Sequence, residues 1–185
     1  HMLRDVLVFS NDFQIESLHA LAEELDWELE HIYPSRVTSH GGFVWLTPDN
    51  IRVHYIENKR FYVRYLILGD EHQDTPLFKQ LMKSLPILDL TEIFRTIEYE
   101  TDDIKRIEAL HKSSALVSPK DKDDAYAEML RRLLTSDQVS DLMRMATLQL
   151  CEELAWDELM PWIEQLAYEE WLGMDMAKRE FRACQ

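Results

Sequence analysis

The hydrophobic pattern of the chain changes once, near Pro86. Before Pro86 the apolar residues form short runs separated by polar turns. After it they recur at helical spacing, and glycine occurs only at Gly173. Periods of two and 3.6 residues are the signatures of strands and helices. The sequence therefore predicts an α+β protein, with a small N-terminal α/β part at residues 2–86 and an all-α part at residues 87–185.

The N-terminal part predicts an antiparallel strand meander. Strand-like apolar runs occupy residues 6–9, 28–33, 43–46, 51–56 and 61–68. The last three are joined by short polar turns, as in consecutive hairpins. Helices are expected over residues 15–25, after the N-cap candidates Ser10, Asn11 and Asp12, and over residues 77–85. Residues 35–42, which end in Gly41-Gly42, are expected to form a loop.

The C-terminal part predicts a series of amphipathic helices joined by short linkers. Their apolar stripes are Ala125/Tyr126, Met129/Leu130 and Leu133/Leu134; Val139, Leu142/Met143, Ala146, Leu150 and Leu154; and Leu159, Trp162/Ile163 and Leu166/Ala167. The acidic run Asp121-Lys122-Asp123-Asp124 is expected to begin a helix, because carboxylates interact favourably with the positive end of the helix dipole. Helices joined in this way pack as antiparallel neighbours.

An internal repeat with an offset of 38 residues links two of these segments. It aligns Ile104 with Leu142, Arg106 with Arg144, and continues to Leu116 and Leu154. Each segment follows a shorter helical run and an acidic turn. A fixed period of this size is typical of helical-repeat proteins.

Residues 127–139, with the small and apolar positions Leu142, Ala146, Leu150 and Leu154 after them, resemble a HEAT repeat. The resemblance covers about half of the chain and implies three helical pairs, at 88–116, 123–154 and 157–184, the last a capping unit. It also implies a scaffold or binding surface, and it is silent about chemistry. A generic helical bundle is the alternative.

The chain is strongly acidic, with 20 Lys and Arg against 35 Asp and Glu and a net charge of −15. Such a surface repels nucleic-acid phosphates and anionic membranes. We therefore expect no binding to nucleic acid or membrane. A basic protein partner is favoured, although the charge can also serve solubility alone.

The motifs of common enzymes are missing from the sequence. It contains no HExxH, P-loop, GxGxxG or GxSxG pattern, and its two cysteines, Cys151 and Cys184, form no CxxC pair. We expect no catalytic residues, no metal site and no cofactor, and free thiols in a reducing, cytoplasmic compartment. An enzyme that uses His40, His54 or Asp70 stays open as an alternative.

One segment combines carboxylates with aromatic rings, and no Lys or Arg occurs between Arg144 and Lys178. The predicted partner-binding residues are Glu152, Glu153, Trp156, Asp157, Glu158, Glu164, Tyr168, Glu169, Glu170 and Trp171. Trp156, Tyr168 and Trp171 are expected to be partly exposed, and Trp162 to be in the core. Exposed rings among carboxylates suit a Lys/Arg-rich partner. The alternative is a solvated acidic face with its rings turned inward.

These features together predict a non-enzymatic interaction protein with an acidic helical face. In its sharpest form the prediction is a bacterial immunity-type inhibitor that neutralises a basic toxin. The alternatives are an adaptor or assembly scaffold, including a homo-oligomer formed through an edge of the sheet, and an enzyme with its site in the α/β half.

Overall fold

The computed structural model describes residues 6–33, 40–69, 75–166 and 168. The chain divides into two compact units, residues 3–117 and residues 118–185, which are described separately below. The sequence analysis placed this boundary after residue 86. The difference concerns the helical hairpin between residues 87 and 117, which belongs to the same unit as the sheet.

The first unit contains a five-stranded antiparallel sheet in the order β1-β5-β4-β3-β2. Its strands are β1 (Val6–Val8), β2 (Glu28–Tyr33), β3 (His40–Leu46), β4 (Arg52–Asn58) and β5 (Val63–Leu68). The predicted meander is confirmed, because β3 pairs with β4 and β4 with β5. The prediction of a loop up to Gly42 is wrong, because His40, Gly41 and Gly42 are already paired with β4.

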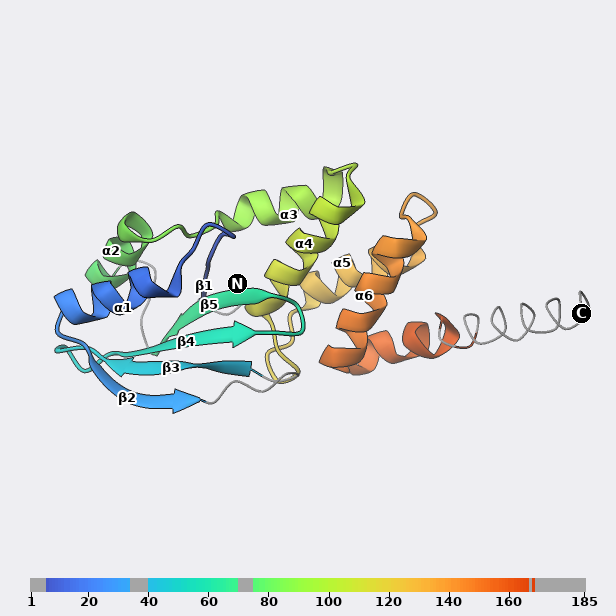
Figure 1. Ribbon diagram of the computed structural model, residues 1–185. Helices are drawn as coiled ribbons and strands as arrows, with labels where there is room; N and C mark the ends of the chain where they lie inside the picture. The colour runs from blue at the N-terminus through green and yellow to red at the C-terminus, as the bar shows by residue number, and fades with distance from the viewer. Residues whose placement is uncertain (1–5, 34–39, 70–74, 167, 169–185) are drawn as a thin grey trace, which may run out of the picture. The chain divides into compact units, whose positions relative to one another are not determined.

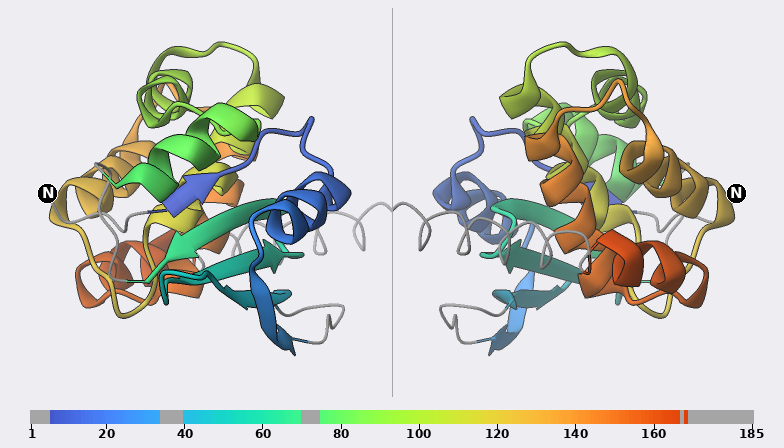
Figure 2. Two further views of the ribbon diagram at one scale, coloured as in Figure 1. Left: turned by 90° about the vertical axis from the view of Figure 1, so that its left-hand side faces the viewer. Right: turned by 90° about the vertical axis from the view of Figure 1, so that its right-hand side faces the viewer.

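Helices α1 (Ile15–Glu24) and α2 (Pro76–Ser84) cover one face of this sheet (Figures 1 and 2). Alternation along β4 turns Val53 and Tyr55 into the core beneath these helices. Thr75 caps α2 by accepting a hydrogen bond from Phe78 N. The predicted cap of α1 is wrong, because its N-cap is Gln14, whose side chain makes no capping bond.

Helices α3 (Leu90–Tyr99) and α4 (Asp103–Ser113), with the short 3-10 turn η1 (Ser114–Leu116), complete the first unit. The chain entering α3 continues the sheet, because Leu88 N donates to Val8 O at 2.8 Å and Phe9 forms a bridge with Ile87. At the other end of the hairpin, Lys112 Nζ donates to Asn11 Oδ1 at 2.9 Å. These contacts hold the hairpin to the strands, which is why the unit ends after Val117.

The second unit is helical over its described residues. It contains α5 (Asp124–Thr135), α6 (Asp141–Leu154), the 3-10 turn η2 (Asp157–Leu159) and a helical stretch over residues 160–166. Asp123 caps α5 by accepting from Tyr126 N at 2.8 Å, as expected for this acidic helix start. Ser140 caps α6 by accepting from Met143 N at 3.2 Å.

The same contact occurs once inside each helical hairpin, at the two arginines that the 38-residue repeat aligns. Arg106 Nε donates to Ile97 O at 3.0 Å, and Arg144 Nε donates to Leu134 O at 3.1 Å. Each guanidinium thus binds a carbonyl near the end of the preceding helix, where four carbonyls lack helical partners. This contact supports a repeated hairpin. A HEAT-like array stays a prediction, and the expected third unit lies largely outside the described residues.

Candidate functional site

The end of α6 presents four of the predicted carboxylates on one chain reversal. Residues 152–158, which we call the acidic turn, place Glu152, Glu153, Asp157 and Glu158 at the surface. The large apolar residues of the same stretch face inward: Leu154 and Trp156 are 4% and 3% exposed. Because the apolar side chains fill the inside of the turn, the carboxylates are held outward within a few residues of one another.

Trp156 anchors this turn from within. Its Nε1 donates to Ser118 O at 3.2 Å, and its ring meets that of Tyr126 edge to face at 6.1 Å. Ala155 before it adopts the left-handed conformation with φ 52°. The prediction that Trp156 is partly exposed is therefore wrong. The buried indole fixes the path of the turn through its hydrogen bond, and its ring is enclosed by the protein.

The carboxylates of the acidic turn lie at a helix end where negative charge destabilises the helix. Glu152 and Glu153 lie in the last turn of α6, which carries no basic residue. A helix C-terminus bears partial negative charge and is stabilised by cations rather than carboxylates. Lys122 Nζ pairs with Glu158 at 2.9 Å, and this hydrogen bond raises the pKa of Lys122. Glu152 and Asp157 make no ion pair within the described part of the chain.

The outer face of α6 adds apolar side chains to these carboxylates. Leu142 is 58% exposed and Met145 is 42% exposed, and both lie on the helix face that continues to Gln149 and Glu152. The prediction that Leu142 belongs to the buried stripe is wrong. Met143, the next residue, is buried, and a helix turns by roughly 100° per residue. The spacing of Leu142, Met145 and Glu152 was the sequence signal for this face.

The remaining predicted residues divide into two groups. Glu164 is exposed and Tyr168 is 60% exposed, whereas Trp162 is half-buried rather than fully enclosed. The predicted residues Glu169, Glu170 and Trp171 lie outside the described residues, as does Cys184. The structure therefore brings together Glu152, Glu153, Asp157 and Glu158, and it adds Leu142 and Met145 to them.

Of the residues of the alternative enzyme site, only the side chain of His54 is described. His54 lies on β4 beside a depression of about 250 Å³ that Tyr33 and Gly41 also line, and burial followed by the charge of Arg52 lowers its pKa. Asp70 and the side chain of His40 lie outside the described residues. Within residues 6–33, 40–69 and 75–166, no three His, Cys, Asp or Glu side chains are grouped as metal ligands. None of the described helices combines the length and apolarity needed to cross a bilayer.

No protein-family model, curated protein or solved structure matches the chain. The resemblance to HEAT repeats therefore rests on the sequence pattern alone, and function has to be argued from the geometry of the two units.

Proposed function

We propose that this protein binds a basic protein partner through the α6 surface, which comprises the outer face of α6 and the acidic turn. The observation that carries the proposal is the exposure of Leu142 and Met145 on the same helix face as Glu152, next to Asp157. No Lys or Arg follows Arg144 until Lys178, so this part of the chain adds no positive charge to that surface.

This combination suits a partner rich in Lys and Arg. Exposed apolar side chains supply area that loses water on binding, and methionine adapts its shape to different partners. Carboxylates around them speed the encounter and set the orientation of a basic protein. A cation placed beside Glu152 and Glu153 also neutralises charge that opposes the helix dipole. Binding of the partner thus reduces the repulsion between these glutamates and the negative end of α6.

The sharper form of the proposal is an immunity-type inhibitor that covers the active surface of a basic toxin, such as a nuclease. What supports it is the net charge of −15 together with an acidic surface on a turn that the buried Trp156 anchors. A toxin that binds nucleic acid carries a basic groove, and an acidic protein surface competes for it.

The first experiment is capture of partners from the source cells on the immobilised protein, followed by binding measurements with the purified partner. The double variant Glu152→Gln/Glu153→Gln should weaken binding and reduce its dependence on salt, because it removes two steering charges. Glu23→Gln/Glu24→Gln is a matched control, since these adjacent exposed glutamates end α1 in the same way. An acidic partner, or equal binding of both double variants, would contradict the proposal.

The inhibitor form needs a separate test. The captured partner is expressed alone and together with this protein, and growth of the host is compared. Toxicity that wild-type protein suppresses, and that Leu142→Ser/Met145→Ser suppresses less, supports an inhibitor. If the partner is harmless when expressed alone, it is not a toxin, and the protein is then a binding protein but not an inhibitor of this kind.

The edge strand β2 supports a second candidate, self-association through the sheet. Every residue of β2 is exposed, and Leu29, Ile32 and Tyr33 are 44%, 55% and 48% exposed. In the sheet order β2 is terminal, and an apolar edge strand readily pairs with another chain. Light scattering should then report a dimer that Ile32→Lys converts to a monomer. A monomeric wild-type protein excludes this candidate.

A further inference from the structure

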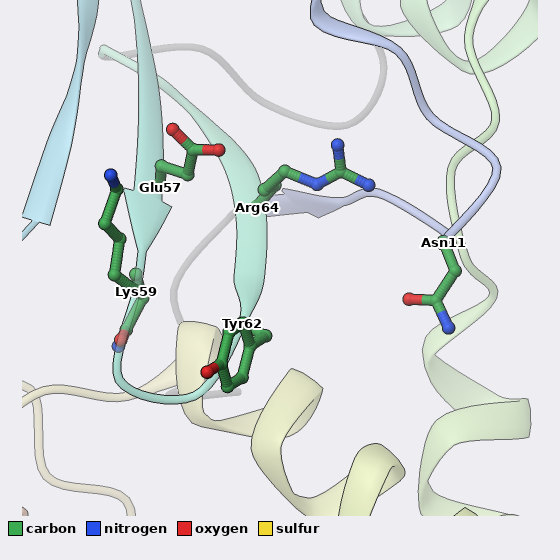
Figure 3. A pocket seen from close by; sticks show the side chains of 6 residues that line it. Asn11, Glu57, Lys59, Tyr62 and Arg64 are labelled. Carbon is green, nitrogen blue, oxygen red and sulfur yellow. The ribbon is translucent and has the colours of Figure 1, made fainter. Parts of the chain in front are cut away.

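The tip of the β4–β5 hairpin in the first unit borders a depression of about 580 Å³ (Figure 3). Its walls are formed by Asn11, Glu57, Asn58, Lys59, Tyr62 and Arg64. A second depression of about 210 Å³ is lined by Asn11, Phe61, Tyr62, Glu108, His111 and Lys112. Asn11 and Tyr62 line both, so the two depressions adjoin. The larger volume lies within the range of small-molecule sites, about 300–1,000 Å³.

Two cations, Arg64 and Lys112, flank the shared wall, and neither forms an ion pair with a carboxylate among the described residues. The Arg64 guanidinium lies 5.0 Å above the ring of Phe13. It stands opposite Glu57 in the β4–β5 register, yet no ion pair joins them among the described residues. In Figure 3 the Arg64 side chain extends toward Asn11 and away from Glu57. A guanidinium held in this way is available to an incoming anion.

Lys112 is the second cation. Its Nζ donates to Asn11 Oδ1 at 2.9 Å. Burial lowers the pKa of Lys112; after burial, the largest effects are that Glu108 raises this pKa, Arg64 lowers it and Asp12 raises it. Arg64 is close enough to act on Lys112, and an anion between them would interact favourably with both cations.

Neutral donors complete the recess. The Asn11 side chain accepts from Lys112 through its oxygen, and its NH2 group makes no hydrogen bond within the described part of the chain. His111 stacks on Phe61 with ring centroids 4.9 Å apart, and its Nε2 is buried without a partner among those residues. Phosphate oxygens accept several such hydrogen bonds at once.

Tyr62 displays a ring at the rim of both depressions. It is 85% exposed, and its φ of 56° lies in the left-handed region, which costs a bulky residue about 1–2 kcal/mol. The side chain of Asn58 stabilises this β4–β5 turn, because its Oδ1 accepts hydrogen bonds from Arg60 N at 3.0 Å and from Phe61 N at 3.1 Å. Backbone strain of this kind clusters at ligand-binding and active sites.

We propose that this site binds a phosphate monoester attached to a planar ring, as in a nucleoside monophosphate. The phosphate lies between Arg64, Lys112 and the Asn11 amide, and the ring stacks on Tyr62. The two linings together hold three cations, Lys59, Arg64 and Lys112, and two carboxylates, Glu57 and Glu108, so their net charge is +1, which suits a single phosphate group better than a polyphosphate. The distant carboxylates of this acidic chain are screened beyond about 8–10 Å.

Binding is measured by calorimetry and NMR titration with adenosine 5′-monophosphate, adenosine and inorganic phosphate. The monophosphate should bind more tightly than adenosine, which lacks the anion, and than phosphate, which lacks the ring. Arg64→Gln or Lys112→Gln should weaken binding about tenfold or more, the size expected for one charge-assisted hydrogen bond. Lys105→Gln, which removes an exposed cation of α4 outside both depressions, should leave it unchanged.

Two further readouts keep the test independent of folding. Tyr62→Ala changes an exposed side chain and should weaken the monophosphate while leaving inorganic phosphate unaffected. Saturation with the monophosphate should raise the pKa of His111, because a new anion then lies beside its ring. Equal affinity for adenosine and its monophosphate, or equal effects of Arg64→Gln and Lys105→Gln, would overturn the proposal.

Discussion

At the scale of single residues, two buried positions have little freedom to change. Gly42 lies where β3 passes close to β4, and a Cβ placed on it would be 1.9 Å from Tyr55 O. Cys151 is fully enclosed in α6, and burial raises the pKa of its thiol to about 12. The sequence predicted free thiols, and Cys151 is a free cysteine in the structure. It did not predict the strand glycine, because two adjacent glycines usually indicate a loop.

Gly42→Ala should destabilise the first unit by about 2 kcal/mol, because backbone atoms of both strands must separate to admit the methyl group. Gly69→Ala is the control, since its nearest neighbour would be Arg52 O at 3.6 Å, an ordinary contact. Its effect should stay within about 0.5 kcal/mol. Urea unfolding followed by circular dichroism compares the two, and equal losses would contradict the steric argument.

Cys151 should make the second unit less stable at high pH. Below about pH 9, the ordinary thiol pKa, the group is protonated in both folded and unfolded chains. Between about pH 9 and 12 the unfolded chain loses the proton while the folded chain keeps it, so the free energy of unfolding falls. Urea midpoints measured from pH 8 to 10.5 should fall more steeply for the wild type than for Cys151→Ala. Parallel curves would show that the thiol does not contribute.

At the scale of elements, the sequence predicted helices and strands well because their periods were clear. The meander, the start of α5 and the α5–α6 hairpin follow from patterns that adjacent residues specify, whereas the α3–α4 hairpin was implied by the repeat. The face that α6 exposes did not follow, because Leu142 and Met143 are equally apolar and only packing decides between them. The repeat was more informative than composition, since Arg106 and Arg144 make the same contact.

Arg144→Met should loosen the α5–α6 hairpin by about 2 kcal/mol or more. Besides Leu134 O, its guanidinium binds Ser136 O at 2.7 Å and Val139 O at 3.2 Å, and charged hydrogen bonds of this kind are the stronger ones. Arg106→Met removes its bond to Ile97 O and should cost about 1 kcal/mol.

Hydrogen exchange read by mass spectrometry over each hairpin measures both losses. Arg95→Met, which breaks only an exposed pair with Glu92, should change exchange by less than about 0.5 kcal/mol. If Arg144→Met resembled Arg95→Met, the guanidinium would not be holding the turn.

At the scale of the whole molecule, the change of hydrophobic period and the boundary between compact units are different things. The period changes near Pro86, but the first unit continues to Val117. Contacts between residues far apart in the sequence, such as Lys112 with Asn11, determine the boundary, and no local pattern contains them. For the same reason the sequence could not predict the recess around Asn11 and Arg64, whose walls come from separate elements.

A fragment of residues 1–117 should fold and unfold cooperatively, whereas a fragment of residues 1–86 should not. The shorter fragment loses the bond from Leu88 N to Val8 O and the stacking of His111 on Phe61. Dispersion of amide NMR signals and the slope of urea unfolding distinguish the two. A well-dispersed spectrum from residues 1–86 would place the boundary where the hydrophobic pattern changes.

The end of α6 also governs how this protein responds to its surroundings. Two glutamates at the negative pole of the helix and an alanine in a left-handed conformation leave the final turn less stable than its packing alone would allow. Moderate salt should therefore tighten this turn by shielding its charges. A cationic client would act in the same direction and more strongly, so complex formation should register as a higher melting temperature of the second unit.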